Sequence, residues 1–288
     1  AWVNTDFLGD VLKNGALADL NELFIGKWPS ASVAERQDGY WARCAQGTKV
    51  HCLFHSRNYS GVIYRTDFLK AAGIDPAALT TWPTFIEAAK KLTVKDASGN
   101  VTRWGFGQQF SEDRADSQMM TSLLLSRQGD LFEEKGRARW SNPTGVEALK
   151  LQTDMVTVHG VTPRQAVTWS SEDLYEQFAA GRLAMFTGAV VRISTMQAKV
   201  GNDNVGFMIW PGIDGKPHSP GVMAGWATGV WSGGRNKALA GKFLEFMTLG
   251  DSDRLWVEVG GQLPGAPSTL DVMKAFTALP ANAYLTTA

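Results

Sequence analysis

The chain has 288 residues, with 28 basic and 28 acidic side chains and a hydrophobic content of 44%. This length exceeds the size at which a single core usually suffices, so we expect two lobes. The balanced charge gives no support for a nucleic-acid or membrane-surface partner, since both favour a basic excess. No run of about 18 apolar residues is present, and we therefore expect no membrane-spanning helix.

The only cysteines, Cys44 and Cys52, flank a turn-like centre over residues 46–49. If a three-residue loop centred on Thr48 joins two short strands, the cysteines face each other and a disulfide can form. A two-residue turn would shift the register and exclude the bridge. Both arrangements fit the sequence, and a bridge would indicate an oxidising compartment.

Capping residues and apolar spacing predict helices over residues 67–72, 82–92, 143–158, 171–180 and 237–247. Thr66 and Thr81 are expected to precede the first two helices, and Gly73 to end the first. Thr144-x-x-Glu147 and Ser170-x-x-Asp173 are candidate capping boxes. The apolar side chains expected to face the core in the last three helices are Val146, Leu149, Met155, Val158, Leu174, Phe178, Leu239, Phe243 and Phe246.

Short apolar runs between these helices predict buried strands over residues 62–64, 183–186, 205–209 and 229–231. Residues 95–100 are polar and rich in turn formers, which predicts a surface hairpin. Helices that alternate with such strands are typical of an α/β protein with mainly parallel sheets.

Several segments in order carry a family resemblance: WVNTDFLGDVLKNGALADL, GVIYRTDFLKAAGID with TTWPTFIEAAKKL, SNPTGVEALKLQTDMV, TWSSEDLYEQFAAGRLAMFTGA and AGWATGVWSGGRNKALAGKFLEFM. Together they resemble the extracellular solute-binding proteins of ABC importers, in the sugar-binding family that includes maltose-binding protein. The resemblance covers nearly the entire chain, although no single segment is diagnostic. It also indicates that the sequence begins at a loop with an early sugar contact, so that the family's opening strand and helix units are missing from it.

The resemblance implies a two-lobed α/β fold of the periplasmic-binding-protein type (type II), with a ligand cleft at the hinge and ligand capture by lobe closure. The first lobe is expected to contain residues 1–57 and 227–264, and the second residues 58–226 and 265–288. The implied partners are a small carbohydrate or related polar solute and the membrane subunits of an ABC permease. The resemblance further implies a monomer without a cofactor, located in the periplasm or outside the cell. It is also compatible with a lipid anchor on the full-length precursor.

Sugar recognition needs polar side chains for the hydroxyl edge and an aromatic ring for the C–H face. In the first lobe, Asp6 matches the family's acidic loop position, with Asn4 as a weaker neighbour; Asp6 as an N-cap is the alternative. Asn58 matches a sugar-contacting position, and Tyr59 lies beside it in the chain. Asn58 in an Asx-turn is the alternative there. Trp226, preceded by Gly225, is the preferred stacking ring, with a core position as the alternative.

In the second lobe, Asp116 and Gln118 lie at the start of an apolar helix and match a ligand-binding position of the family; surface capping is the alternative. Gly188 and Arg192 follow a buried strand, where backbone amides and a guanidinium can meet oxygen ligands. A plain salt bridge of Arg192 is an equally open interpretation.

The sequence carries no nucleotide-binding or nucleophile motif. His51 and His55 are four residues apart in a strand-like region without a further ligand type nearby, so no metal site is expected. We therefore expect a binding protein rather than an enzyme. Two rivals stay open: a glycoside hydrolase that uses Asp6 and Asp116, and a receptor for a glycerol-phosphate-type anion that uses Arg192.

Overall fold

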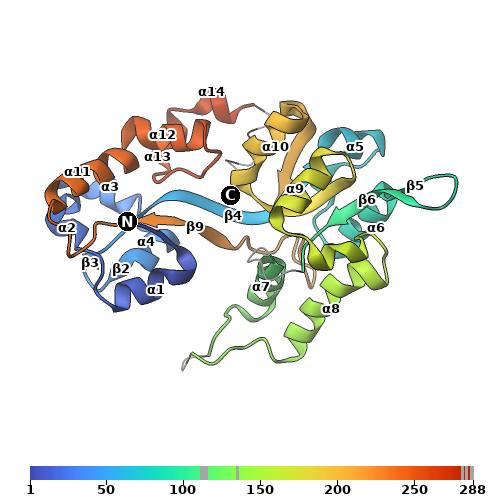
Figure 1. Cartoon of the computed structure of the whole chain (residues 1–288), viewed down its shortest axis with the longest axis horizontal. Helices are drawn as coiled ribbons and strands as arrows, with labels where there is room; N and C mark the ends of the chain where they lie inside the picture. The colour runs from blue at the N-terminus through green and yellow to red at the C-terminus, as the bar shows by residue number, and fades with distance from the viewer. Residues whose placement is uncertain (111–115, 134–135, 280–281, 283–284, 286–288) are drawn as a thin grey trace. The chain divides into compact units, whose positions relative to one another are not determined.

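The computed structural model describes residues 1–110, 116–133, 136–279, 282 and 285, without the side chains of residues 6, 116 and 117 (Figure 1). The chain forms two compact units. Unit 1 contains Ala1–Tyr59 and Met223–Thr287, and unit 2 contains Ser60–Val222. Among the helices of the described residues, none has the length and apolar character required to cross a bilayer.

The sheet of unit 1 is antiparallel and is formed by β1 (Trp2–Asn4), β9 (Met223–Thr228) and the first part of β4 (Leu53–Arg65), in that order. Trp226 is paired with Asn4 on one side, and Asn58 is paired with Ala224 on the other. Side chains directly opposite each other in such a ladder lie on the same face of the sheet. One face of the sheet therefore carries the side chains of Asn4, Trp226 and Asn58, which come from three different strands.

Most helices of unit 1 are short. Their bounds are Thr5–Lys13 (α1), Leu20–Leu23 (α2), Ile25–Lys27 (η1), Ser30–Ala34 (α3), Gly39–Cys44 (α4), Lys237–Thr248 (α11), Gly250–Glu258 (α12), Ser268–Asp271 (α13) and Lys274–Thr277 (α14). The buried apolar side chains include Leu8, Leu20, Phe24, Phe54 and Leu244. They come from both parts of the chain that form unit 1, so neither part holds this core alone.

Cys44 and Cys52 form a disulfide, with their Cα atoms 5.1 Å apart. The turn between β2 (Ala45–Gln46) and β3 (Lys49–Val50) has two residues, which we expected to exclude the bridge. That reasoning was wrong because the cysteines lie outside the short ladder. Cys44 ends α4, its carbonyl accepts a hydrogen bond from the His51 N–H at 2.9 Å, and Cys52 follows.

Helix α11 buries a different face from the predicted one. Leu239, Phe243 and Phe246 are between 61% and 69% exposed, whereas Gly241 and Leu244 face the core. The small Gly241 explains the choice, because a Cβ atom there would lie only 3.3 Å from Leu23 Cβ. A glycine on the inner face allows α11 to approach α2 closely, and the larger apolar side chains are left outside.

Unit 2 is built on a mixed sheet in the order β8, β4, β7, β6 and β5. The strands are Val205–Met208 (β8), the end of β4 from Ser60 onward, Leu183–Ala189 (β7), Val101–Gly107 (β6) and Val94–Lys95 (β5). Among the described strands, β6 and β7 are the one parallel pair, so the expectation of mainly parallel sheets was wrong. Both β7 and β8 run antiparallel to β4, which lies between them in the sheet.

Helices pack against this sheet and give unit 2 a continuous core (Figure 1). They are Thr66–Ala71 (α5), Trp82–Leu92 (α6), Asp116–Gln128 (α7), Pro143–Thr157 (α8), Ser171–Ala179 (α9) and Ile193–Val200 (α10), with short helical turns at Pro76–Ala78 (η2), Arg164–Thr168 (η3), Val190–Arg192 (η4) and Asn202–Asn204 (η5). Phe85, Leu92, Phe106 and Met155 are fully buried in it.

Several local predictions for unit 2 are confirmed. Thr81 caps α6, Ser170 and Asp173 form a capping box at α9, and Gly73 follows α5 with a positive φ of 63°. The exposed hairpin between β5 and β6 is also present. Thr66 is the first residue of α5 rather than its cap, which is Arg65.

The predicted start of α8 at Pro143 is confirmed, whereas Thr144 as its capping residue and most of the predicted buried face were wrong. Asn142, not Thr144, caps this helix, because Asn142 Oδ1 accepts a hydrogen bond from the Gly145 N–H at 2.9 Å. Val146, Leu149 and Val158 are exposed, and the buried positions are Gly145, Ala148, Gln152 and Met155. Gly145 lies against the backbone of Trp140, in the segment that leads into α8, so a side chain has no room at this position.

Two further expectations differ from the structure. Residues 229–231 extend no strand, since β9 ends at Thr228 and Trp231 forms only an isolated bridge with Leu17. Residues 265–279 belong to unit 1 rather than to the second lobe, and the chain passes between units at 59/60 and 222/223. The reason is local: Arg57 Nη1 donates to the carbonyls of Pro264 and Gly265, both at 2.8 Å.

Candidate functional site

Trp226 is the most exposed of the predicted binding residues in the strands of unit 1. It is 43% exposed on β9, while the next residue, Ala227, is buried on the opposite face. A Cβ atom at Gly225 would collide with the Ser56 carbonyl oxygen, so only glycine allows β9 and β4 to approach here. The strand beneath the indole is therefore held by main-chain packing, and the ring is presented from a fixed support.

Asn4, on β1, is half-buried and pairs with Trp226 in the ladder. Its Oδ1 accepts a hydrogen bond from Thr5 Oγ1 at 3.3 Å. An amide beside an exposed indole combines an apolar plate with a polar edge, which suits a ligand that has both kinds of surface.

The structure buries Asn58 and Tyr59, each at 6% exposure. The Asn58 carbonyl accepts a hydrogen bond from the Tyr40 hydroxyl at 2.5 Å, and the same hydroxyl contacts the Ala224 carbonyl at 3.1 Å. Tyr40 therefore ties β4 to β9 at this point. Asn58 lies in a regular strand with Ala224 opposite, so it occupies no Asx-turn.

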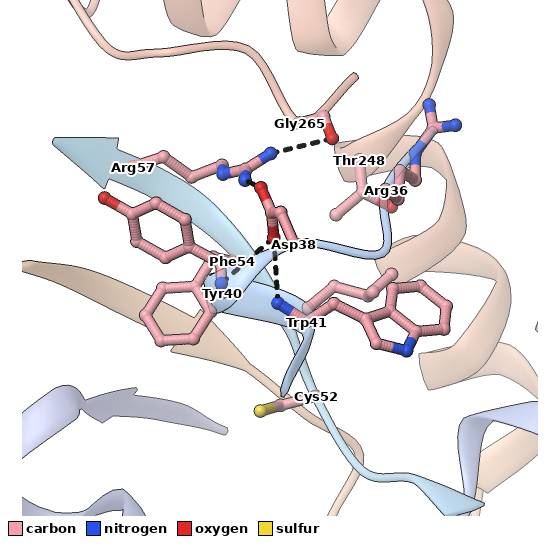
Figure 2. A pocket seen from close by; sticks show the side chains of 10 residues that line it. Arg36, Asp38, Tyr40, Trp41, Cys52, Phe54, Arg57, Thr248 and Gly265 are labelled. Atoms are coloured by element: carbon pink, nitrogen blue, oxygen red, sulfur yellow. Dashed lines mark hydrogen bonds and ion pairs between the residues drawn. The ribbon is translucent and has the colours of Figure 1, made fainter. Parts of the chain in front are cut away.

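Arg57 was not among the predicted contacts, and it forms the centre of a buried polar cluster in unit 1. Figure 2 shows its guanidinium between the Asp38 carboxylate, with which it forms an ion pair, and the Gly265 carbonyl. The guanidinium also lies over the Tyr40 ring, 4.5 Å from its centroid. Burial lowers the pKa of Arg57 to about 10. This value is still well above neutral pH, so the guanidinium stays charged there.

The hollow beside this cluster is small. Arg36, Asp38, Trp41, Phe54 and Arg57 line a cavity of about 30 Å³ (Figure 2). That volume holds about one water molecule and no sugar ring. Asp38 also caps α4, because its Oδ1 accepts hydrogen bonds from the Tyr40 and Trp41 N–H groups at 3.0 Å. The cluster is therefore structural: it fastens β4, α4 and the segment after α12 to one another.

A second cluster of side chains in unit 1 surrounds His55. Its ring lies 4.9 Å from that of Trp2 and 5.0 Å from that of Trp256, and its Nδ1 is 2.6 Å from Thr228 Oγ1. Burial lowers the pKa of His55 to about 4, because the ring is shielded from the water that would stabilise its charged form. His51, in contrast, contacts the Leu17 carbonyl through Nδ1 at 3.0 Å. Each histidine thus has its own packing partner.

In unit 2, Gly188 and Arg192 lie where β7 ends and η4 begins. Gly188 is buried, and a Cβ atom there would lie 2.7 Å from Ile63 Cδ1, so the position has no room for a side chain. The Arg192 guanidinium lies 3.9 Å from the Glu172 carboxylate and 5.0 Å from the centroid of the Tyr175 ring. Part of its positive charge is therefore already balanced within unit 2.

The acidic candidates lie at helix starts. Asp6 is the second residue of α1, so it is not the N-cap, and Asp116 is the first residue of α7. Both side chains lie outside the described part of the structure. Gln118 is half-buried in the first turn of α7. The predicted set thus falls into separate groups: Asn4, Asp6, Asn58, Tyr59, Gly225 and Trp226 in unit 1, and Asp116, Gln118, Gly188 and Arg192 in unit 2.

Sequence reasoning missed two polar residues at the end of the sheet in unit 2, Gln109 and Thr187. Both are buried. Thr187 directly follows the buried strand predicted over residues 183–186, and Gln109 follows the apolar run at residues 104–107; neither was assigned a role. Polar residues directly after a buried strand are the signal that could have drawn attention to them.

A larger pocket of about 410 Å³ lies in unit 2, and none of the predicted binding residues lines it. It is bounded by the starts of α6 and α8, the end of α7 and residues 212–215. Arg127 at its edge forms ion pairs with both Glu147 and Asp214, the latter through two contacts of 2.8 and 2.9 Å. The charge of this arginine is thereby neutralised inside the unit.

A family model described as a bacterial extracellular solute-binding protein matches residues 1–249. A curated relative from Sinorhizobium fredii, a probable amino-acid ABC transporter periplasmic-binding protein, is 22% identical over 218 residues. That match covers 74% of this chain and 46% of the relative, so the chain spans about half of the relative's length.

Solved structures share the fold. A solute-binding protein of an ABC transporter from Thermotoga lettingae, bound with α-D-tagatose, has a TM-score of 0.82 at 22% identity and covers 97% of this chain and 70% of its own. A maltose-bound protein of T. maritima has a TM-score of 0.79 at 22% identity, with 99% and 71% covered. A glycerophosphocholine complex from Mycobacterium tuberculosis has a TM-score of 0.80 at 17% identity, with 97% and 68% covered.

Proposed function

Because the chain belongs to the bacterial extracellular solute-binding protein family, we propose that it is the substrate-binding component of an ABC importer. In this proposal it captures a neutral carbohydrate outside the cytoplasm and delivers it to a membrane permease. The tagatose and maltose complexes of proteins with the same fold support the choice of ligand class. Family membership supports the location.

The exposed indole of Trp226 is the observation that carries the ligand class. A sugar ring has C–H groups on its faces and hydroxyls along its edge, so it binds best to an aromatic plate next to polar groups. Trp226 offers the plate, and Asn4 on the neighbouring strand offers an amide. A purely apolar ligand would use the indole alone and would form no hydrogen bond with this amide.

Capture by lobe closure is part of the proposal. The chain passes between the units at 59/60 and again at 222/223, and a movement of one unit relative to the other would turn about these two passages. A ligand that bonds better to the closed arrangement would increase its population. The permease would then recognise that arrangement.

The test is isothermal titration of the protein with D-tagatose, maltose, glycerophosphocholine and L-glutamine, followed by the same titrations of Trp226→Ala. We expect a sugar to bind and Trp226→Ala to weaken its binding at least tenfold, which corresponds to about 1.4 kcal/mol. Trp231→Ala is the matched control. Trp231 is also an exposed tryptophan of unit 1, 64% accessible, but it lies outside the strands.

The outcomes separate the two parts of the proposal. If neither D-tagatose nor maltose binds, the carbohydrate assignment is overturned. Binding with equal affinity in the protein and in Trp226→Ala would keep the carbohydrate and remove Trp226 from the site.

A phosphodiester is the second candidate ligand, favoured by the glycerophosphocholine complex of a protein with the same fold. Arg192 would be the cation for it. The contact of Arg192 with Glu172 weighs against this candidate, since part of the charge is already used. Preferential binding of glycerophosphocholine over both sugars would favour it.

Glycoside hydrolysis is the rival activity that the proposal argues against. The family comprises binding proteins, and the two carboxyl groups of the hydrolase rival, those of Asp6 and Asp116, lie outside the described side chains. We expect no release of reducing ends when the protein is incubated with maltose and maltotriose. Measurable turnover would identify an enzyme instead.

A further inference from the structure

Unit 2 contains buried polar atoms that make no hydrogen bond. Within the described residues, neither the Nε2 nor the Oε1 of Gln109 has a partner, and the same holds for Thr187 Oγ1. Gln109 is only 1% exposed. Buried polar side chains are rarely left in this state, because each loses its hydrogen bonds to water without replacement. These groups therefore require an explanation.

Both residues lie near the same edge of the sheet. Strands β6 and β7 run parallel, with Gly107 opposite Phe186 as the last paired positions. Gln109 comes two residues after Gly107, and Thr187 comes directly after Phe186. Gln109 therefore follows the carboxyl end of β6, the edge at which open α/β sheets bind ligands, while Thr187 lies in β7 just beyond the last position paired with β6 and opposite Val62 of β4. Gly188 and Arg192 follow Thr187 at this edge.

The surrounding polar groups are satisfied, which makes the two residues stand out. The neighbouring Gln108 donates through Nε2 to the Gln152 carbonyl at 2.7 Å. Thr162 Oγ1 donates to the Phe106 carbonyl at 3.0 Å, and the Phe110 N–H donates to the Ala166 carbonyl at 3.2 Å. Local packing at the end of β6 therefore pairs hydrogen-bonding groups without difficulty. The amide of Gln109 is left out of that arrangement.

The chemistry of the unpaired atoms indicates what would bind them. An amide donates through its NH₂ group and accepts through its oxygen, and a threonine hydroxyl does both. Neither group carries charge. Two adjacent hydroxyls of a sugar or polyol, which also donate and accept, complement this combination better than an anion or a hydrocarbon would.

We propose that Gln109 and Thr187 form a polar binding subsite in unit 2 that recognises hydroxyl groups of a neutral polyhydroxylated ligand. This inference rests on the proposed function and adds two specificity-determining residues to it. Because the amide is covered in the present arrangement, rotation of the flexible Gln109 side chain is the movement that exposes it to the ligand. The hydrogen bonds missing within the protein are then made with the ligand.

The test uses Gln109→Met and Thr187→Val, which keep the shape of each side chain and remove the unpaired atoms. Gln108→Met is the matched control, since it removes a neighbouring amide that already has a partner. Each protein is titrated calorimetrically with D-tagatose and with maltose, and its thermal midpoint is measured without ligand.

A specific pair of opposite effects is expected. Gln109→Met and Thr187→Val should each weaken sugar binding about tenfold, the loss of roughly one hydrogen bond. Each should also raise the midpoint of the ligand-free protein by roughly 2–4 °C, because an unpaired buried group is gone. Gln108→Met should lower the midpoint and leave the affinity unchanged. A purely structural role would change stability alone.

The results distinguish this inference from the proposed function. If the unchanged protein binds neither sugar, the proposed function fails and the subsite fails with it. If the unchanged protein binds a sugar and Gln109→Met and Thr187→Val bind it equally well, the subsite alone is overturned. That second result would leave an internal water as the partner of the amide.

Discussion

Different interactions stabilise the inside of unit 1 and the inside of unit 2. Unit 2 has a continuous apolar core in which α6 contributes Phe85 and Leu92 and the sheet contributes Phe106. Unit 1 also has an apolar core, and it adds specific links to that core: the disulfide, the ion pair of Arg57 with Asp38, and the ring stack around His55. At the same time it leaves large apolar side chains of α11 exposed. Dispersed apolar packing tolerates small changes, whereas a few specific links concentrate stability in a few residues.

The largest effect is expected from Arg57→Ala. It removes the cation from a buried cluster and leaves Asp38 and two carbonyl groups without their partner. Arg57 is buried but the Asp38 side chain is 42% exposed, so we expect a loss at the lower end of the range for buried pairs, about 3 kcal/mol. Hydrogen exchange followed by mass spectrometry should show faster exchange in peptides of unit 1, and little change in peptides of unit 2. Phe85→Ala is the reciprocal control, with faster exchange expected in unit 2. Equal effects of Arg57→Ala on both units would contradict the comparison.

The next effect concerns the disulfide. Replacement of both cysteines, Cys44→Ala with Cys52→Ala, removes a link between residues eight positions apart. The loop-closure model gives a loss of about 2–3 kcal/mol for a loop of this size. The denaturation midpoint of the double variant should fall and should no longer respond to a reducing agent, while the unchanged protein responds. An unaltered midpoint would show that the tertiary packing of α4 suffices.

The smallest of these effects depends on pH. The folded-state pKa of His55 is lowered to about 4 from an ordinary value of 6.5, so the unfolded chain binds the proton first. The stability that neutral His55 contributes is therefore complete above pH 6.5 and is lost as the pH falls towards 4. A change of about 2 kcal/mol is expected over this range. His55→Phe should flatten the dependence of the unfolding free energy on pH between 6.5 and 4. A slope that persists in this variant would assign it to other groups.

Local structure could be predicted from the sequence where one residue decides it. Thr81 and Pro83 mark the start of α6, and Ser170 with Asp173 marks α9. The buried faces of α8 and α11 could not be predicted from the positions of large apolar side chains. In both helices a glycine lies on the buried face at a close contact: Gly241 of α11 beside Leu23 of α2, and Gly145 of α8 beside the backbone of Trp140. Apolar periodicity does not detect that kind of close contact.

The candidate site was only partly predictable for a similar reason. Gly225 and Trp226 stand out in the sequence, and the structure pairs them with Arg57 and Asn4 in neighbouring strands. Asn58 looked equally suitable because polar residues surround it, yet the strand that carries it is almost fully buried. Whether Gln109 is paired depends on contacts from α8 and η3 at the end of β6. Such contacts between segments far apart in sequence are invisible to residue patterns.

The division of β4 between the two units has a consequence for the order of folding. Unit 2 is continuous in sequence, whereas unit 1 needs β9, which is separated from the early strands of unit 1 by residues 60–222. Until β9 pairs with it, the first part of β4 has an open edge. Unit 2 can fold meanwhile, and it would hold the far end of that strand in place until β9 arrives.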